Sequence, residues 1–114
     1  MTRAHRPARA GRALALEGAL ALEPSGHALF RLAPDLLLVF KPRGHRESEH
    51  AHGHAQRLRV LRGRLAVATA RRVVVLVPAS CPLAIPAGRR HATEALTDVW
   101  LVAERRSERA ARGA

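Results

Sequence analysis

Short apolar segments separated by turn-forming residues extend over most of the chain from Ala13 onward. Proline, glycine, serine and aspartate, which favour turns, interrupt the apolar pattern at 24–26, 34–35, 42–44 and 78–80. Many short strands without a long amphipathic helix indicate an all-β sandwich or barrel. The pattern predicts strands at approximately 14–22, 27–32, 36–41, 45–52, 56–62, 64–69, 71–77, 82–86, 90–95 and 98–104.

The segment 56–62 shows the strand pattern most clearly. Leu58 and Val60 alternate with two arginines, which is the period of a strand with one buried face. Gln56 has the same parity as these apolar residues, so we expect its side chain to face the core while the arginines face water. Gly63 follows where a hairpin needs a residue that tolerates a positive φ.

Histidines concentrate just before this segment. His50 and His52 are two residues apart, and residues i and i+2 of a strand point to the same face. Gln56 would approach from the next strand, and His91, just beyond the turn signal at 86–88, would approach from a third. Three imidazoles and one amide oxygen therefore form a candidate set of four metal ligands. A His-rich tract can also bind metal adventitiously, and this alternative stays open.

The spacing of these residues matches a motif of the form Gly, five residues, His-x-His, three or four residues, Glu, six residues, Gly. The chain meets it with Gly44, His50, His52, Gln56 in place of Glu, and Gly63.

A second motif has the form Gly, five residues, Pro-x-Gly, two residues, His, three residues, Asn. The chain meets it with Ser80 in place of Gly, Pro86, Gly88, His91, and Ala95 in place of Asn. With both motifs, which cover nearly half of the chain, the sequence resembles the small single-domain bacterial cupins.

The resemblance implies an all-β fold of the cupin type, a double-stranded β-helix or jelly-roll barrel of the RmlC-like kind. It also implies one divalent transition metal per chain, held by His50, His52, Gln56 and His91. Zinc, iron, manganese, nickel and copper all accept such ligands. Cupins commonly pair through their outer strands, so the resemblance further implies a homodimer.

Gln56 changes the chemistry that the resemblance implies. Its neutral carbonyl oxygen replaces a carboxylate, so a divalent ion would keep its full charge. This favours Lewis-acid action on a small anionic or carbonyl-bearing substrate by an isomerase, cyclase or lyase. In this respect the chain is similar to the cupins that linearise unsaturated uronates and to some polyketide cyclases. A metal-dependent dioxygenase and a non-catalytic regulatory or accessory cupin are the alternatives.

Other polar residues near the motifs are candidates for acid–base roles. His54 lies in the expected turn after His52, and Glu49 precedes His50; these two are the nearest candidates for a general base. Glu47 and Glu49 have the opposite parity to His50, so we expect both to face outward. Among the remaining histidines, we expect His27 and His5 to be solvated.

Two basic termini flank the predicted domain. The net charge is +11, and nineteen of the twenty basic residues are arginine. We expect a disordered basic arm at 1–12, a cupin domain at 13–104 and a charged tail at 105–114. The sequence has three aromatic residues of the Phe, Trp and Tyr types and no recognition-helix or zinc-finger pattern, so a small-molecule ligand is favoured over nucleic acid.

The single cysteine and the apolar segments bear on the compartment. Cys81 has no partner for an internal disulfide, and we expect a buried or half-buried reduced thiol. A charged residue, Glu17, interrupts the apolar segment 13–22, and no apolar run approaches the length of a membrane span. We therefore expect a cytoplasmic protein that does not insert into a membrane.

Overall fold

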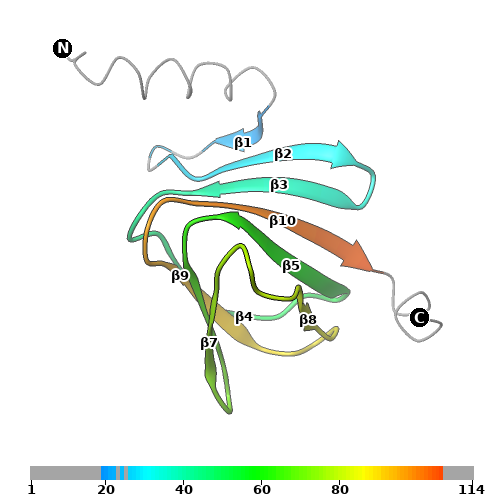
Figure 1. Cartoon of the computed structure of the whole chain (residues 1–114). Helices are drawn as coiled ribbons and strands as arrows, with labels where there is room; N and C mark the ends of the chain where they lie inside the picture. Colours follow the sequence, from blue (N-terminus) through cyan, green and yellow to red (C-terminus); the bar gives the residue numbers. More distant parts are fainter. Residues whose placement is uncertain (1–18, 23, 25, 107–114) are drawn as a thin grey trace.

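The computed structural model describes residues 19–22, 24 and 26–106, and all regular structure within these residues is β (Figure 1). The strands are β1 (Ala19–Leu22), β2 (Ala28–Ala33), β3 (Leu36–Lys41), β4 (Arg46–His50), β5 (Ala55–Arg62), β6 (Leu65–Thr69), β7 (Val73–Leu76), β8 (Leu83–Ile85), β9 (His91–Ala95) and β10 (Val99–Arg106). Each corresponds to a predicted strand, so the all-β prediction is confirmed. The predicted arm at 1–12 and residues 107–114 lie outside the described residues.

Several strand boundaries differ from the prediction, and two of these differences affect the residues discussed below. β4 ends at His50, so His52 lies in the following loop and not on the strand. β10 continues to Arg106, because Arg105 and Arg106 still pair with β5. The first two residues of the predicted charged tail therefore belong to the domain.

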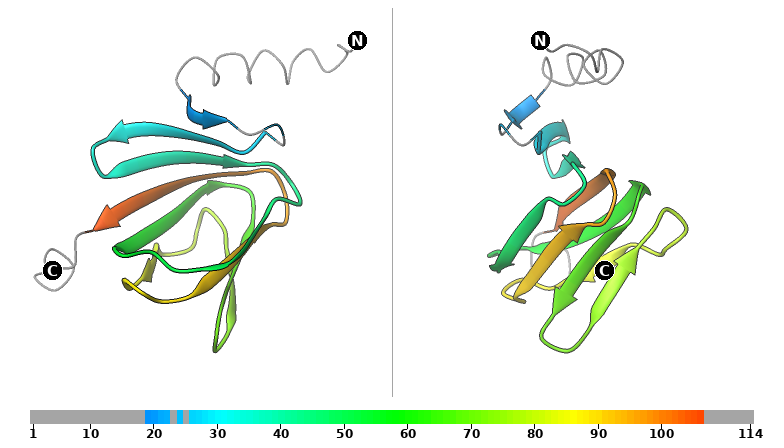
Figure 2. Two further views of the ribbon diagram at one scale, coloured as in Figure 1. Left: turned by 180° about the vertical axis from the view of Figure 1, so that it is seen from behind. Right: turned by 90° about the vertical axis from the view of Figure 1, so that its left-hand side faces the viewer.

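The strands form two antiparallel sheets that face each other. The larger sheet has the order β1-β2-β3-β10-β5-β8, and the smaller has the order β4-β9-β6-β7. Figure 1 shows β2, β3, β10 and β5 side by side, with β4, β9 and β7 in a second layer, and Figure 2 shows the same layers from behind and from one side. Neighbours such as β3 and β10 lie far apart in sequence, so folding depends on long-range pairing.

The core lies between the two sheets. In β10, Val99, Leu101 and Ala103 are buried and alternate with half-buried residues. Leu65 and Val67 of β6 face them from the smaller sheet and are almost fully inaccessible. Burial of each such side chain stabilises the fold by about 1.5–3 kcal/mol.

The expected alternation in β5 is confirmed. Leu58 and Val60 are buried, Arg57 and Arg59 are exposed, and Gln56 is half-buried. The β5–β6 hairpin also has the predicted glycine geometry at Gly63, whose φ is 94°. A Cβ at that position would collide with the backbone carbonyl oxygen of Asp98, so a larger residue would strain the turn.

An irregularity in β4 decides which of its side chains face the interior. Glu47 pairs with Thr93 and His50 pairs with His91, so three steps along β4 correspond to two steps along β9. This bulge reverses the parity between Glu47 and His50, and both face the interior beside the buried residues of β9. The prediction that Glu47 faces outward is wrong for this reason.

Two further observations concern the loops and the membrane expectation. Cys81 is exposed in the turn between β7 and β8, so the expectation of a buried or half-buried thiol is wrong. Its place between two prolines keeps it in a surface connection. None of the described segments forms a helix that could span a membrane.

Candidate metal centre

Three histidines converge at one end of the smaller sheet. His50 ends β4 and lies directly opposite His91, the first residue of β9. His52 approaches from the loop after β4, and one ligand atom from each of the three residues lies within 4.8 Å of the others. The ring centroids of His50 and His91 are 4.4 Å apart. Three imidazoles predicted as ligands are therefore brought together.

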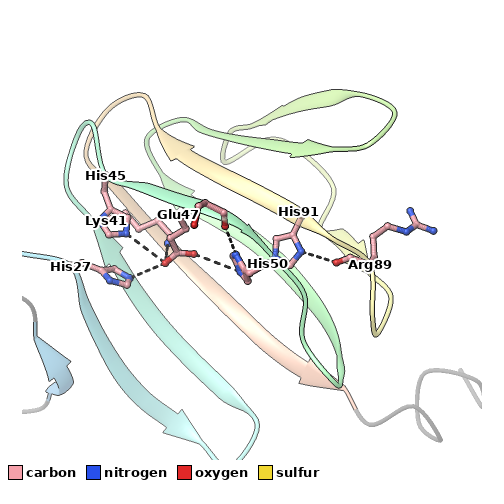
Figure 3. A network of polar contacts seen from close by, with 8 residues as sticks. His27, Lys41, His45, Glu47, His50, Arg89 and His91 are labelled. Atoms are coloured by element: carbon pink, nitrogen blue, oxygen red, sulfur yellow. Dashed lines mark hydrogen bonds and ion pairs between the residues drawn. The ribbon is translucent and has the colours of Figure 1, made fainter.

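Backbone carbonyl groups fix the orientation of two of these rings. His50 Nδ1 lies 2.7 Å from the Ser48 carbonyl oxygen, and His91 Nδ1 lies 3.1 Å from that of Arg89 (Figure 3). A carbonyl oxygen only accepts, so each Nδ1 carries the proton and each Nε2 keeps its lone pair. This arrangement is common among metal-binding histidines, because the second ring nitrogen sets the tautomer of the first.

His52 joins the other two histidines from a loop, whereas strand parity predicted that it lies on the same strand as His50. It lies beyond the end of β4, where the chain no longer alternates. The Gly88 amide donates a hydrogen bond of 2.8 Å to the His52 carbonyl oxygen. Since Gly88 belongs to the turn just before His91, this bond ties the two segments that carry the histidines. Gly88 has a φ of 79°, a conformation that glycine adopts without strain.

Gln56 faces the histidines from the other sheet. It lies in β5, opposite Arg105 of β10, and its side chain lines the same cavity as the three histidines. The cavity has a volume of about 210 Å³. Its remaining walls are mostly apolar and include Leu29, Leu37, Val39, Leu58, Leu65 and Leu101. The four residues predicted as ligands therefore share one small, largely apolar cavity.

The donor set fits a divalent transition metal. Imidazole nitrogens bind such ions at about 2.0–2.1 Å, so two ligands of one ion are at most about 4.2 Å apart. The observed limit of 4.8 Å needs only a small ring movement to reach this value. Burial, followed by the charges of His50, His54 and His91, lowers the pKa of His52. A lowered pKa keeps the imidazole neutral near pH 7, as metal binding requires.

A second group of polar side chains lies near the three histidines, and the sequence did not predict it. Glu47 Oε2 accepts a hydrogen bond of 2.8 Å from Lys41 Nζ. The same oxygen lies 3.6 Å from His27 Nε2 and 3.5 Å from His45 Nε2, and Figure 3 shows these side chains gathered around it. His27 and Lys41 are only 8% and 5% exposed. The expectation that His27 is solvated is therefore wrong.

In this second group, which we call the Glu47 group (His27, Lys41, His45 and Glu47), the carboxylate is paired with an ammonium. Burial alone would raise the pKa of Glu47, but the charge and hydrogen bond of Lys41, together with His27 and His45, lower it below its usual value. The carboxylate is therefore ionised at neutral pH. One signal in the sequence was available, because Lys41 is the single lysine among nineteen arginines. An ammonium is more compact than a guanidinium and suits a buried position.

The other sequence candidates lie outside the three-histidine group. Glu49 is exposed and forms an ion pair of 3.3 Å with Arg90 Nε. His54 stacks on His52 with ring centroids 5.1 Å apart. Burial, followed by the charge of Arg105, lowers the pKa of His54, and Asp35 opposes this shift. The suggestion that Glu49 or His54 acts as a general base remains a prediction.

Comparison with solved structures identifies the architecture. An RmlC-like cupin from Shewanella frigidimarina NCIMB 400 is 20% identical with a TM-score of 0.62, covering 78% of this chain and 84% of that one. A cupin superfamily protein from Desulfitobacterium hafniense DCB-2 is 18% identical with a TM-score of 0.60, covering 81% and 86%. KdgF from Halomonas sp. is 22% identical with a TM-score of 0.59, covering 76% and 85%.

These similarities establish the fold. The chain has the cupin jelly-roll fold, and the fold that the two sequence motifs implied is confirmed. No family model and no curated protein matches the sequence. At these identities the structural likeness does not transfer a reaction, because one fold hosts many chemistries. The case for function therefore depends on the site itself.

Proposed function

We propose that this chain is a metal-dependent cupin enzyme that uses a divalent ion as a Lewis acid on a small oxygen-bearing substrate. The observation that carries the proposal is the meeting of three imidazoles in one cavity, two with the proton held on Nδ1 by a backbone carbonyl group. Gln56 lines the same cavity and is the fourth proposed ligand. The reaction is of the isomerase, cyclase or lyase type.

The charge of the four proposed ligands supports a non-redox role. Three neutral imidazoles and an amide leave the full charge of a dication uncompensated by its ligands. When bound, the ion would polarise a carbonyl or carboxylate oxygen of the substrate. His50 and His91 would hold the ion through their Nε2 atoms, and the apolar wall would exclude water from the hydrocarbon part of the substrate. A cavity of about 210 Å³ restricts the substrate to a small molecule.

Metal analysis of untagged protein tests the site. We expect close to one equivalent of a divalent transition metal per chain after purification with and without oxygen. His91→Ala should remove most of the metal while the circular dichroism of the barrel is kept. The matched control is His54→Ala, which removes a neighbouring imidazole outside the three-histidine group and should keep the metal. Equal metal loss in both variants, or metal below a third of an equivalent in the wild type, would contradict the proposal.

The same experiment separates the proposed enzyme from its alternatives. Zinc would favour Lewis-acid chemistry, whereas iron that is retained only without oxygen would favour a dioxygenase. Small carbonyl compounds and hydroxy acids are then screened for turnover by the loaded protein. Tight binding of a metabolite without any product would identify a regulatory or accessory cupin instead.

We also propose that the protein is a homodimer joined through the outer face of its larger sheet. Trp100 lies between buried residues of β10 and therefore points away from the core. Phe40 and Phe30 lie near it, with ring centroids 4.8 Å and 6.2 Å away. These are the only three Phe, Trp or Tyr residues of the chain, and their concentration on one face suits an interface with a second copy. Analytical sedimentation tests the proposed dimer: the wild type should sediment as a dimer and Trp100→Glu as a monomer. A monomeric wild type would contradict the proposal.

A further inference from the structure

We infer that the Glu47 carboxylate forms, with Thr93 beside it, a subsite that binds a hydroxyl group of the substrate. This inference rests on the proposed function, because the hydroxyl would belong to a molecule whose other oxygen is held at the three-histidine group. The substrate class is therefore narrowed to small hydroxy acids and hydroxy carbonyl compounds.

The two oxygens of Glu47 have different surroundings. Oε2 is bound by Lys41 and flanked by two imidazoles. Oε1 faces the other way and lies 4.0 Å from His50 Nε2, the atom available for a metal. This distance is too long for a hydrogen bond. One oxygen is thus held by the protein, and the other is presented beside the three-histidine group as an acceptor.

Thr93 provides a second observation at the same place. It pairs with Glu47 across β4 and β9 and lines the same cavity. Thr93 is 8% exposed, and its hydroxyl has no hydrogen-bond partner within residues 26–106 or the other described positions. Buried hydroxyls in proteins almost always have a partner, so a polar group in the cavity would satisfy this one. A substrate hydroxyl can donate to Glu47 and accept from Thr93.

A second metal ion is the competing explanation of the Glu47 group. Ligand atoms of His27, His45 and Glu47 lie within 4.8 Å of one another, as in the three-histidine group. The Lys41 ammonium, however, already occupies the carboxylate oxygen that these histidines face. A dication placed there would be repelled by a buried cation that has no other acidic partner among the described residues. The charge balance therefore favours a hydroxyl subsite.

The rest of the cavity restricts the ligand further. Apart from the polar residues already described, the wall consists of leucine, valine and alanine side chains, so the remainder of the substrate is hydrocarbon. A second carboxylate placed near Glu47 would be repelled by it. The cavity volume of about 210 Å³ admits only a small molecule. A compact monocarboxylic hydroxy acid fits these limits, and a dicarboxylic acid does not.

Lactate and 2-methoxypropionate provide the test, because the methoxy compound keeps the oxygen but carries a methyl group in place of the donated proton. Binding to the zinc-loaded full chain is measured by titration calorimetry. We expect lactate to bind about tenfold or more tightly than 2-methoxypropionate, since hydrogen bonds to charged groups are strong. This ratio should fall severalfold in the variant Lys41→Met/Glu47→Leu, which removes both buried charges together. Glu94→Gln, an outward carboxylate on β9, is the matched control and should keep the ratio.

The outcomes distinguish this inference from the proposed function. If zinc does not bind, or neither acid binds to the loaded wild type, the proposed function fails. If both acids bind and the wild-type ratio is near one, or is unchanged in the double variant, only the Glu47 subsite is overturned. Two zinc equivalents per chain, with one lost in His45→Ala, would establish a second metal ion and also overturn it. If the double variant does not fold, the wild-type ratio alone decides.

Discussion

The three-histidine group and three members of the Glu47 group (His27, Lys41 and Glu47) line one cavity, but the two groups differ in their electrostatics. The three-histidine group has no carboxylate among its members, and two of its rings keep a free Nε2. The Glu47 group pairs its carboxylate with Lys41 at 2.8 Å and is mostly buried. The three imidazoles offer a bound cation no counter-charge, whereas the carboxylate of the Glu47 group already has the Lys41 ammonium as its counter-charge. Whether a cluster of histidines suits a metal ion therefore depends on the charged groups beside it as well as on the distances between its ligand atoms.

The largest expected effect comes from removing one charge of the Glu47 group. Lys41→Met leaves the Glu47 carboxylate in the cavity without its ammonium and should lower the free energy of unfolding by about 3 kcal/mol, measured in urea. Lys41→Met/Glu47→Leu removes both charges and should recover most of this loss. A single variant as stable as the wild type would show that the group is not held by its ion pair.

Metal removal should affect stability through the three-histidine group. A metal at a hundred times its dissociation constant stabilises the folded state by about 2.7 kcal/mol, so a chelator should lower the unfolding temperature. His91→Ala should abolish this chelator effect, and His45→Ala should retain it. If His45→Ala abolished it instead, the roles assigned to the two groups would be reversed.

Acidification should affect the two groups in different pH ranges. Metal binding requires neutral imidazoles, so metal should be released as acidification protonates the three histidines, and the lowered pKa of His52 moves its protonation to a more acidic pH. The folded pKa of Glu47 is lowered, so its stabilisation is complete above the unfolded pKa of 4.5 and is lost as the pH falls through the folded pKa. Metal content and urea unfolding between pH 7 and 3 check this order. If the free energy of unfolding of the wild type equalled that of metal-free Glu47 variants at every pH, this predicted order would be contradicted.

The smallest effect is expected outside both groups. Glu49 and Arg90 form an exposed pair, and such pairs contribute less than about 1 kcal/mol. Glu49→Gln should therefore change neither metal content nor unfolding temperature measurably. Turnover that falls sharply in this variant, with metal retained, would instead support the sequence-based suggestion that Glu49 acts as a general base.

Strand parity predicted part of the site correctly and part of it wrongly. It placed Gln56 on the buried face of β5, because residues 56–60 of that strand alternate regularly. It wrongly placed Glu47 on the outer face of β4. A bulge between Glu47 and His50 inverts the alternation there, and strand parity does not reveal it. Strand parity also assigned His52 to a strand that ends at His50. His52 does join the other two histidines as predicted, but not because it shares a strand face with His50. Its loop is held in place by the hydrogen bond from the Gly88 amide to the His52 carbonyl oxygen.

The amino-acid sequence by itself determined the ten strands, the turn at Gly63 and the residues that form the three-histidine group, because these follow from local alternation, turn residues and motif spacing. Only the tertiary structure decided that His27, Lys41, His45 and Glu47 meet around one carboxylate oxygen. β2 and β3 belong to one sheet and β4 to the other, so this meeting depends on sheet packing. The physical reason is that a bulge and a sheet-to-sheet contact are long-range features, which no period along the chain encodes.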